Sequence, residues 1–327
     1  MAIGILGMGS YLPDRVVTNA EISQWAGVTE EWVVERTGIK ERRYRAPGTV
    51  TSDLAAHAAR LALADGTADA ERLQALIVAT CTPDMPQPAT AAIVQSKLGI
   101  RSVPAFDVNA VCAGFVFSLG IAEGLLAGRP SSATALVIGA DMFSTVMDRS
   151  DRRTVSLFGD GAGAVLLGRV PDGYGIQALR MVTDGEYCED IMVEAGGTRL
   201  PADAAARAEG RHLFRMNAPI AKDYVMTTMR KLVTEVLADR GLTLADVDRF
   251  VFHQANTRLL EALAADLGLD MARVPTTTWQ YGNTAGASVP LTLHDSHRRR
   301  PLHRGERVLL AAAGGGFGAG AALLTWY

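Results

Sequence analysis

The chain of 327 residues contains an internal repeat, and this repeat limits the folds that it can adopt. Residues 73–84 read LQALIVATCTPD and residues 247–258 read VDRFVFHQANTR; each is a short apolar run that ends in small polar residues and is followed by a helical stretch. Corresponding segments of the two copies lie 171–174 residues apart. A structural unit that occurs twice predicts two similar halves packed together.

Each copy closes with an apolar segment, ALVIGAD from Ala135 and RVLLAAA from Arg307. Apolar strands that alternate with helices, here over 89–98 and 259–267, are typical of a sheet covered by helices on both sides. We therefore expect an α/β chain of two halves, residues 1–170 and 171–327, divided at a turn marked by Pro171 and Gly173. A site between the halves is expected, because strand ends at such junctions often hold ligands.

Composition excludes several classes of protein. The chain is 48% hydrophobic and 20% charged, which favours a large core, and its net charge of −3 argues against a nucleic-acid binder. Its three cysteines, Cys81, Cys112 and Cys188, have no C-x-x-C spacing. We therefore expect neither a disulfide framework nor a metal site, and a reducing, cytoplasmic setting.

The segment 308–327 has no charged residue and is long enough to span a membrane. A run of three glycines, Gly314 to Gly316, interrupts it and would weaken a helix. We predict two buried strands joined by a glycine turn, and no membrane span. The N-terminal residues carry no secretion signal. A further helix is predicted over 218–239, and residues 184–209 are predicted to be irregular.

Cys112 lies among small residues, three positions before the start of the apolar stretch FVFSLG. We expect it at the first turn of a buried helix, where unpaired N–H groups and the helix dipole favour a thiolate. A small buried cysteine without a chemical role is the simple alternative. The neighbouring Ala110, Ala113 and Gly114 leave room for a substrate and favour a nucleophile.

His253 and Asn283 are the other candidates for chemistry. His253 ends a buried strand, where a histidine needs a partner; a hydrogen-bonded core histidine is the alternative. Asn283 lies in YGNTAG, which a Gly–Asn turn would also explain. Asn283 is 171 residues after Cys112, so the repeat predicts equivalent places for the two. Together the three side chains suit thioester chemistry, in which a thiolate takes an acyl group and two donors bind the carbonyl of a second thioester.

Several short motifs follow one another along the chain. They are Gly7–Pro13 (GMGSYLP), Arg36–Ile39 (RTGI), Asp107–Gly114 (DVNAVCAG), Phe158–Ala164 (FGDGAGA), His253–Asn256 (HQAN), Gly282–Thr284 (GNT) and Gly314–Gly316 (GGG). With these motifs the chain resembles β-ketoacyl-acyl carrier protein synthase III essentially from end to end.

The resemblance implies a thiolase-like fold, in which two duplicated α/β halves pack as five layers (αβαβα), and a homodimer. It implies Cys112 as the nucleophile, His253 and Asn283 as the decarboxylation pair, and an oxyanion hole formed by the backbone N–H groups of Cys112 and Gly315. An acyl-CoA would acylate Cys112. A malonyl thioester, on carrier protein or coenzyme A, would then lose carbon dioxide and condense with the acyl group, which primes fatty acid or polyketide synthesis.

The resemblance also assigns substrate contacts. Coenzyme A and its pantetheine arm would contact Trp32, Arg36, Thr37, Arg152, Phe214 and Asn256, with Trp32 and Arg152 on either side of the adenine. Gln87 and Phe143 would border the acyl pocket. Arg215 and Arg258 would meet an acyl carrier protein. No metal or permanently bound cofactor is implied, because coenzyme A thioesters serve as substrates.

Three positions depart from the family's usual pattern. Ala265 and Asp266 stand where two lysines often help to attract the acidic carrier protein, Gln87 replaces a bulky aromatic residue, and Ala313 replaces a phenylalanine before the three glycines. The set is typical of a specialised biosynthetic member.

Two alternatives stay open. A non-condensing acyltransferase would pass the acyl group to an amine or alcohol, although it would have less need of Asn283. A non-catalytic partner subunit would have no need of an activated Cys112. Hydroxymethylglutaryl-CoA synthase shares the fold, but the sequence has no glutamate in a recognisable catalytic motif.

Overall fold

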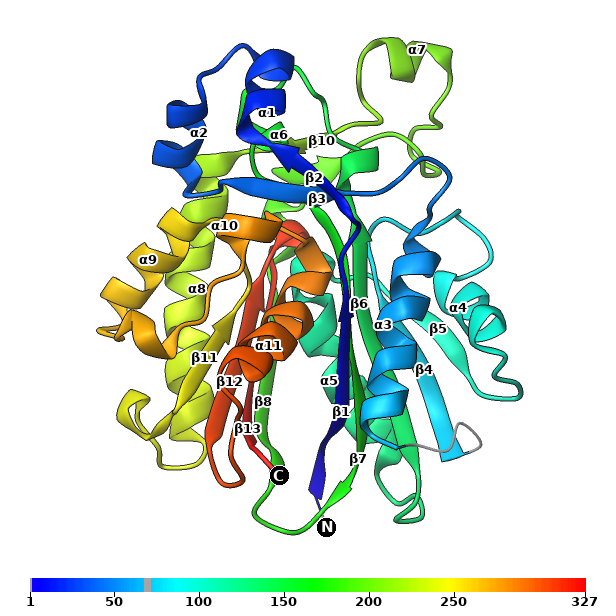
Figure 1. Ribbon diagram of the computed structural model, residues 1–327, viewed down its shortest axis with the longest axis vertical. Helices are drawn as coiled ribbons and strands as arrows, with labels where there is room; N and C mark the ends of the chain where they lie inside the picture. Colours follow the sequence, from blue (N-terminus) through cyan, green and yellow to red (C-terminus); the bar gives the residue numbers. More distant parts are fainter. Residues whose placement is uncertain (1, 68–71) are drawn as a thin grey trace.

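Two β-sheets form the centre of the molecule (Figure 1). The structure is a computed structural model that describes residues 2–67 and 72–327. The first sheet contains, in spatial order, β1 (Ala2–Tyr11), β7 (Asp160–Val170), β6 (Thr134–Met142), β4 (Leu73–Ala79) and β5 (Ala105–Val108). The second contains, in spatial order, β8 (Gly175–Thr183), β13 (Gly318–Thr325), β12 (Arg307–Ala313) and β11 (Arg249–Phe252).

The two sheets have the same topology, as the repeat predicts. In the first, β4 runs parallel to β6, β6 is antiparallel to β7, and β7 is antiparallel to β1. In the second, β11 runs parallel to β12, β12 is antiparallel to β13, and β13 is antiparallel to β8. Among the described residues β5 has no counterpart, because the second copy forms the short helix α10 (Thr278–Tyr281) after Val274.

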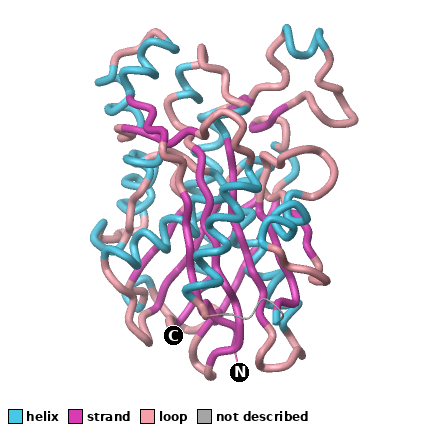
Figure 2. Tube along the Cα trace, turned by 45° about the vertical axis from the view of Figure 1, so that its right-hand side comes forward, coloured by secondary structure: helices cyan, strands magenta, loops and turns pink. Residues whose placement is uncertain are grey.

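Helices separate and cover the two sheets, which makes five layers. α5 (Gly114–Leu126) and α11 (Ser288–Arg299) contact strands of both sheets and form the central layer. α3 (Thr51–Asp65) and α4 (Thr90–Leu98) cover the first sheet, and α8 (Ala218–Ala238) and α9 (Thr257–Asp266) pack together over the second. In Figure 2 the strands run lengthwise with helices beside them. The expected thiolase-like fold is confirmed.

The largest hydrophobic cluster fills the space between the sheets. α5 contributes Phe115, Val116 and Leu119, which are fully buried, while Val137 reaches the cluster from the first sheet and Leu310 from the second. A helix that is apolar on most sides is stable only in such a position. The apolar stretch after Cys112 therefore forms the buried helix that the sequence predicts.

Smaller elements lie above the sheets, at the end opposite the chain termini (Figure 1). They are β2 (Arg15–Thr18), α1 (Asn19–Ala26), α2 (Glu30–Thr37), β3 (Glu41–Tyr44), α6 (Arg152–Val155), β9 (Ile191–Val193), α7 (Ala204–Ala208) and β10 (Phe214–Met216). The hydroxyl of Thr29 caps the start of α2, and Gly38, with φ 71°, follows its last residue. Arg258 of α9 donates to the carbonyls of Val34 and Glu35, which fixes α2 beside the second half.

The apolar segment 308–327 forms β12 and β13, joined by a turn at the three glycines. In the described part of the chain, helices that combine enough length and apolar character to cross a membrane are absent. The predicted helix over 218–239 is α8. Residues 184–209 are mostly irregular, with β9, α7 and one 3-10 turn.

Candidate active site

Cys112 is buried at the entrance to the central helix α5. It is the middle residue of a three-residue 3-10 turn, Val111–Ala113, that leads into the helix, and only 7% of it is exposed. Its thiol interacts with two backbone N–H groups, its own and that of Gly315. The predicted place at the start of a buried helix is confirmed.

The thiol of Cys112 is protonated in the free enzyme at neutral pH. Burial raises its pKa to about 12, and the charge of Asp141 adds to the increase. The N–H groups of Gly315 and Cys112 lower the pKa by less than burial raises it. Burial therefore opposes the thiolate that the sequence predicts at the helix start, because desolvation disfavours the charged form.

The glycine turn after β12 approaches Cys112 closely. A Cβ atom on Gly314 would lie 2.6 Å from the Cβ of Cys112 and 3.0 Å from its sulfur, so a larger residue would displace the thiol. The next residue, Gly315, directs its N–H to the sulfur. Close backbone approach explains why this turn consists of glycine.

His253 follows β11 and is held by the first residue of α11. Its Nδ1 atom lies 2.7 Å from the hydroxyl oxygen of Ser288, and 8% of the residue is exposed. Burial lowers the pKa of the imidazole to about 4, so the ring is neutral at physiological pH. Because Ser288 occupies Nδ1, Nε2 is the nitrogen that a substrate can meet. No sequence motif singled out Ser288.

Asn283 is held through its backbone and one side-chain atom. Its N–H donates to the carbonyl of Leu157, and its own carbonyl accepts from the N–H of Gly159. The side-chain oxygen accepts from the N–H of Ala285 at 2.9 Å. The amide NH₂ group is then available to a substrate, so the Gly–Asn turn and a chemical role coexist.

The repeat places Cys112 and Asn283 differently from the sequence-based prediction. Val111 and Ala285 each start a 3-10 turn before a central helix, and both have φ 47°. They are 174 residues apart, so the equivalent of Cys112 is Gly286 and that of Asn283 is Asn109. The prediction that Cys112 and Asn283 are equivalent, at an offset of 171, is therefore wrong: the offset is three residues larger, which is one turn of a 3-10 helix. The two residues still lie at one site.

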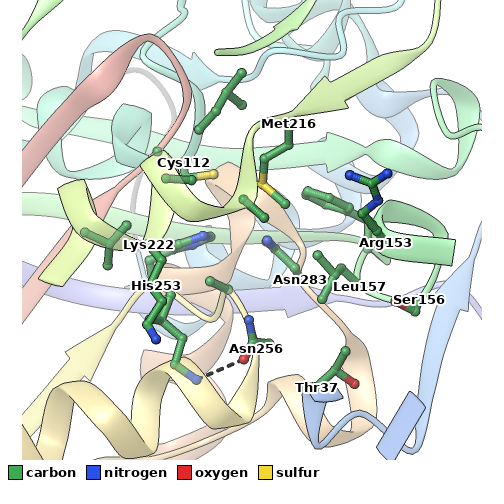
Figure 3. A pocket seen from close by; sticks show the side chains of 18 of the residues that line it. Thr37, Cys112, Arg153, Ser156, Leu157, Met216, Lys222, His253, Asn256 and Asn283 are labelled. Carbon is green, nitrogen blue, oxygen red and sulfur yellow. Dashed lines mark hydrogen bonds between the residues drawn. The ribbon is translucent and has the colours of Figure 1, made fainter. Parts of the chain in front are cut away.

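A cavity of about 690 Å³ contains the three side chains (Figure 3). All six residues assigned to coenzyme A line it: Trp32, Arg36, Thr37, Arg152, Phe214 and Asn256. The guanidinium of Arg152 lies 5.5 Å from the centre of the Trp32 ring. Two further cations of the lining, Arg153 and Lys222, were not foreseen. Within the described residues no cluster of side chains suits a metal ion.

Three phenylalanines pack together beside Cys112. Phe143 and Phe158 stack with ring centres 4.4 Å apart, and Phe214 meets them edge-on at 5.3 and 5.0 Å. All three belong to the same buried cluster as Cys112. Phe143, predicted for the acyl pocket, and Phe214, predicted for the pantetheine arm, both line the cavity.

The remaining assigned residues lie at or outside the mouth of this cavity. Arg258 lines it and pairs with Glu261 at 3.0 Å. Arg215 lies outside the lining and pairs with Glu194. Gln87 is exposed and does not line the cavity.

Asp141, a residue that the sequence did not single out, joins the two halves near Cys112. It is fully buried at the end of β6. One carboxylate oxygen accepts from the N–H groups of Cys81 and Thr82, and the other from the N–H of Gly286 at 2.8 Å. Gly286 is the structural equivalent of Cys112, so Asp141 fixes the turn that faces the Cys112 turn.

Fold and cavity together indicate a class of protein: an acyl-transferring enzyme with the thiolase fold. Comparison with known proteins identifies the family. The model of 3-oxoacyl-[acyl-carrier-protein] synthase III matches residues 106–185, and the model of its C-terminal part matches residues 237–326. The chain belongs to the 3-oxoacyl-[acyl-carrier-protein] synthase III family, as the sequence predicts.

Individual relatives match over nearly the whole length. Acetoacetyl CoA synthase NphT7 of Streptomyces sp. strain CL190 is 42% identical over 324 residues, which cover 98% of each chain. β-Ketoacyl-[acyl-carrier-protein] synthase III of Rhodospirillum centenum is 44% identical over 328 residues, with the same coverage. The crystal structure of the synthase III from Thermus thermophilus superposes with a TM-score of 0.91 at 37% identity and covers 99% of both chains.

Proposed function

We propose that the enzyme joins an acyl group from acyl-CoA to a malonyl thioester, with Cys112, His253 and Asn283 as its catalytic residues. Cys112 attacks the acyl thioester, coenzyme A leaves, and the acyl group stays on the sulfur. The malonyl thioester then enters with its carbonyl oxygen between Nε2 of His253 and the NH₂ group of Asn283. Loss of carbon dioxide leaves an enolate, which attacks the acyl carbonyl and releases the β-ketoacyl thioester.

The observation that carries this proposal is the pair of neutral donors beside the thiol. Ser288 Oγ lies 2.7 Å from Nδ1 of His253, and as donor it leaves the ring proton on Nε2. The low pKa of His253 keeps the ring neutral. Ala285 fixes the amide of Asn283 with its NH₂ group free. Donors fixed before the reaction stabilise a developing enolate without reorganisation.

The oxyanion of the acyl transfer step needs a second set of donors. We assign this role to the backbone N–H groups of Cys112 and Gly315, because both already interact with the sulfur to which the acyl group becomes attached. Oxyanion donors are effective when they surround the carbonyl that the nucleophile attacks.

The negative charges of coenzyme A are matched by positive charges at the mouth of the cavity. Arg36, Arg152, Arg153 and Lys222 line it, and in the described part of the chain none of their side chains has an ion-pair partner. Free cations at a cavity mouth suit the phosphates of coenzyme A. Arg152 over Trp32 suits its adenine.

In this proposal the malonyl group of the second substrate is attached to coenzyme A and not to an acyl carrier protein. The two arginines assigned to carrier docking are both paired with acids, Arg215 with Glu194 and Arg258 with Glu261. Asp266, at a position where the family often has lysine, pairs with Arg230. An acidic partner gains little from arginines that are already neutralised. The name of NphT7, an acetoacetyl CoA synthase, fits a product on coenzyme A.

The enzyme is proposed to act as a cytoplasmic homodimer, in which Gln87 of one subunit approaches the acyl pocket of the other. Gln87 lies on an exposed loop, where a second subunit could cover it. Light scattering of the purified protein tests the dimer. The division of the chain at residues 170 and 171 likewise stays a prediction.

Intact-protein mass spectrometry combined with carbon dioxide release tests the reaction. Wild-type enzyme is treated with acetyl-CoA, and then with malonyl-CoA or a malonyl carrier protein. The Asn283→Asp variant has nearly the same shape but lacks the donor, so we expect it to form the acetyl-enzyme and to release little carbon dioxide. Cys112→Ala should form no acetyl-enzyme.

Acyl transfer to an amine or alcohol is the alternative. If the acetyl-enzyme of the wild type persists with every malonyl thioester and is discharged by a small amine or alcohol, the condensation proposal is wrong. Comparable rates with malonyl-CoA and malonyl carrier protein would contradict the preference for coenzyme A.

A further inference from the structure

Two helices from different halves of the chain border the cavity next to each other. Trp32, Arg36 and Thr37 belong to α2, in the first half, and Arg258 and Leu259 belong to α9, in the second. The two helices are in contact. The position of α2 against α9 therefore determines where the three coenzyme A residues of α2 lie relative to the rest of the cavity.

Arg258 binds the last turn of α2 through two backbone carbonyls. Its Nε donates to the carbonyl oxygen of Glu35 at 3.2 Å, and its Nη2 donates to that of Val34 at 3.4 Å. Its Nη1 pairs with Glu261, one turn further along α9, at 3.0 Å. Carbonyls in the last turn of a helix lack partners within the helix, and a cation near them also interacts favourably with the helix dipole. The guanidinium thus joins α9 to the C-terminal end of α2.

Gly38, directly after α2, brings the backbone at this end close to α9. It has φ 71°, and a Cβ atom on it would lie 2.5 Å from the Cβ of Thr257. Thr257 is the first residue of α9 and precedes Arg258. Rotation of the threonine side chain could not make room for that atom, because the Cβ that it meets is attached to the backbone. Two adjacent residues of α9 therefore hold the end of α2, and we call this the α2–α9 contact.

We propose that Arg258 is a positioning residue for coenzyme A and acts through α2. By holding α2 against α9, it keeps Trp32, Arg36 and Thr37 in place for the adenine and the pantetheine arm. The inference rests on the proposed function and deepens it, because it gives Arg258 a role in binding acyl-CoA instead of docking a carrier protein.

The α2–α9 contact is predicted to affect binding and not the chemical step. In the proposed function α2 meets the nucleotide and the arm of coenzyme A, which lie away from the thioester that Cys112 attacks. An interaction that contributes equally to the bound substrate and to the transition state changes the half-saturating concentration and leaves the maximal rate nearly unchanged. A general defect in folding would not separate the two quantities in this way.

Acetylation of Cys112 by two donors of different size tests the proposal. Acetyl-CoA carries the nucleotide and the full arm, whereas the acetyl thioester of N-acetylcysteamine has the same reacting group and lacks the nucleotide. Acetyl-enzyme is measured over time by intact-protein mass spectrometry at several donor concentrations, without a malonyl thioester. For acetyl-CoA this gives the half-saturating concentration and the maximal rate, and for the truncated donor it gives the second-order rate constant.

Arg258→Ala removes both hydrogen bonds to the end of α2. We expect the half-saturating concentration of acetyl-CoA to rise about fivefold, with a maximal rate within about twofold of the wild type. The rate constant with the truncated donor should also stay within about twofold. Because Arg258 is exposed, the variant should fold normally.

Two glycine variants form a matched pair in which Arg258 stays in place. Gly38 and Gly99 follow α2 and α4, and both have φ 71°. Among the described residues, a Cβ atom on Gly99 would meet no atom beyond its chain neighbours within 4 Å, so Gly99→Ala adds only backbone strain. Gly38→Ala adds the same strain and also pushes α2 away from Thr257. We expect Gly38→Ala to raise the half-saturating concentration of acetyl-CoA about fivefold, and Gly99→Ala to resemble the wild type.

The outcomes distinguish the possible roles of Arg258. If Arg258→Ala weakens acetyl-CoA binding while Gly38→Ala behaves like Gly99→Ala, Arg258 acts without α2 and the proposal is wrong. Equal losses with acetyl-CoA and the truncated donor would indicate a general defect and also overturn it. Unchanged acetylation of Arg258→Ala overturns it too, and slower condensation of that variant with a malonyl carrier protein would then assign Arg258 to docking. If the wild type forms no acetyl-enzyme on Cys112, the proposed function itself fails.

Discussion

Val111 and Ala285 have the same left-handed backbone conformation, with φ 47°, at equivalent turns in the two halves of the molecule. Residues with side chains seldom adopt this conformation, and it is least favourable for a β-branched residue such as valine. The two turns contact each other between the sheets. One carries Cys112, and the other contains Gly286, whose N–H donates to Asp141. The strained pair thus fixes where Cys112 lies relative to the opposite half.

Replacement of Ala285 by glycine tests the strain. A glycine normally destabilises by about 0.5–1 kcal/mol, and loss of a buried methyl costs about 0.8 kcal/mol more. At Ala285 the relief of about 1–2 kcal/mol should offset both losses. Ala287→Gly is the matched control, because Ala287 is equally buried in the same turn but has φ −78°. We expect chemical denaturation to show Ala287→Gly less stable than Ala285→Gly by about 1 kcal/mol; equal stability would contradict the argument.

The raised pKa of Cys112 predicts how its reactivity depends on pH. With a pKa of about 12, the fraction of thiolate is small at pH 7 and increases as pH rises. Alkylation of the free enzyme by iodoacetamide should therefore accelerate by about tenfold per pH unit between pH 7 and 9. Peptide mass spectrometry distinguishes Cys112 from the exposed Cys188. If the alkylation rate stopped increasing below pH 8, the N–H groups would lower the pKa of Cys112 more than burial raises it.

Ser288 is predicted to position His253 for the second half-reaction. Ser288→Ala removes the partner of Nδ1 and lets the ring change its tautomer or orientation. We expect carbon dioxide release to slow by about 10- to 100-fold, while acetylation of Cys112 proceeds at nearly the wild-type rate. Ser288→Thr keeps the hydroxyl and should restore much of the activity. Equal losses in both steps would indicate a general structural defect instead.

Arg152 is predicted to hold the adenine end of coenzyme A. Arg152→Ala should raise KM for acetyl-CoA about fivefold with little change in kcat, because stacking on Trp32 contributes to binding far from the reacting atoms. The neighbouring pair Arg149 and Trp25, 4.5 Å apart, lies outside the cavity lining. Arg149→Ala therefore serves as the control and should leave KM unchanged.

The three phenylalanines beside Cys112 predict a short starter. Phe214→Ala removes the ring that meets both Phe143 and Phe158 and opens space beyond the thiol. The wild type should form an enzyme adduct with acetyl-CoA far faster than with hexanoyl-CoA, and the variant should accept hexanoyl-CoA at least about tenfold better than the wild type. An unchanged preference would place the acyl chain elsewhere.

Most of the fold could be predicted from the sequence because its signals are repeated. Two similar apolar segments of known spacing are enough to predict two sheets with helices between and outside them. The exact offset between the two copies could not be predicted, because Cys112 and Asn283 stand in similar glycine-containing strings. Only the backbone angles of Val111 and Ala285 reveal that the offset is 174 residues. Residue spacing also gave no sign that, in the part of the chain that the structure describes, the second copy lacks a strand equivalent to β5.

The same holds for the site: residues in local motifs could be predicted, and residues whose partners are distant in the chain could not. Cys112, His253 and Asn283 stand in recognisable motifs, whereas Ser288 and Asp141 act through partners far away in the chain. The packing of Phe214 against Phe143 and Phe158 could not be predicted, because it joins residues far apart in the sequence. The pKa of Cys112 depends on burial, which the sequence does not measure.

The central helical layer, which both halves share, determines what happens when the chain is cleaved between them. α5 and α11 each contact both sheets, so a cut between β7 and β8 would leave two fragments with wide apolar surfaces exposed. Such fragments should aggregate alone and regain acyl-enzyme formation only when refolded together. We therefore expect neither half to fold without the other, although the two are similar in topology, and recovery of catalysis would report their reassembly.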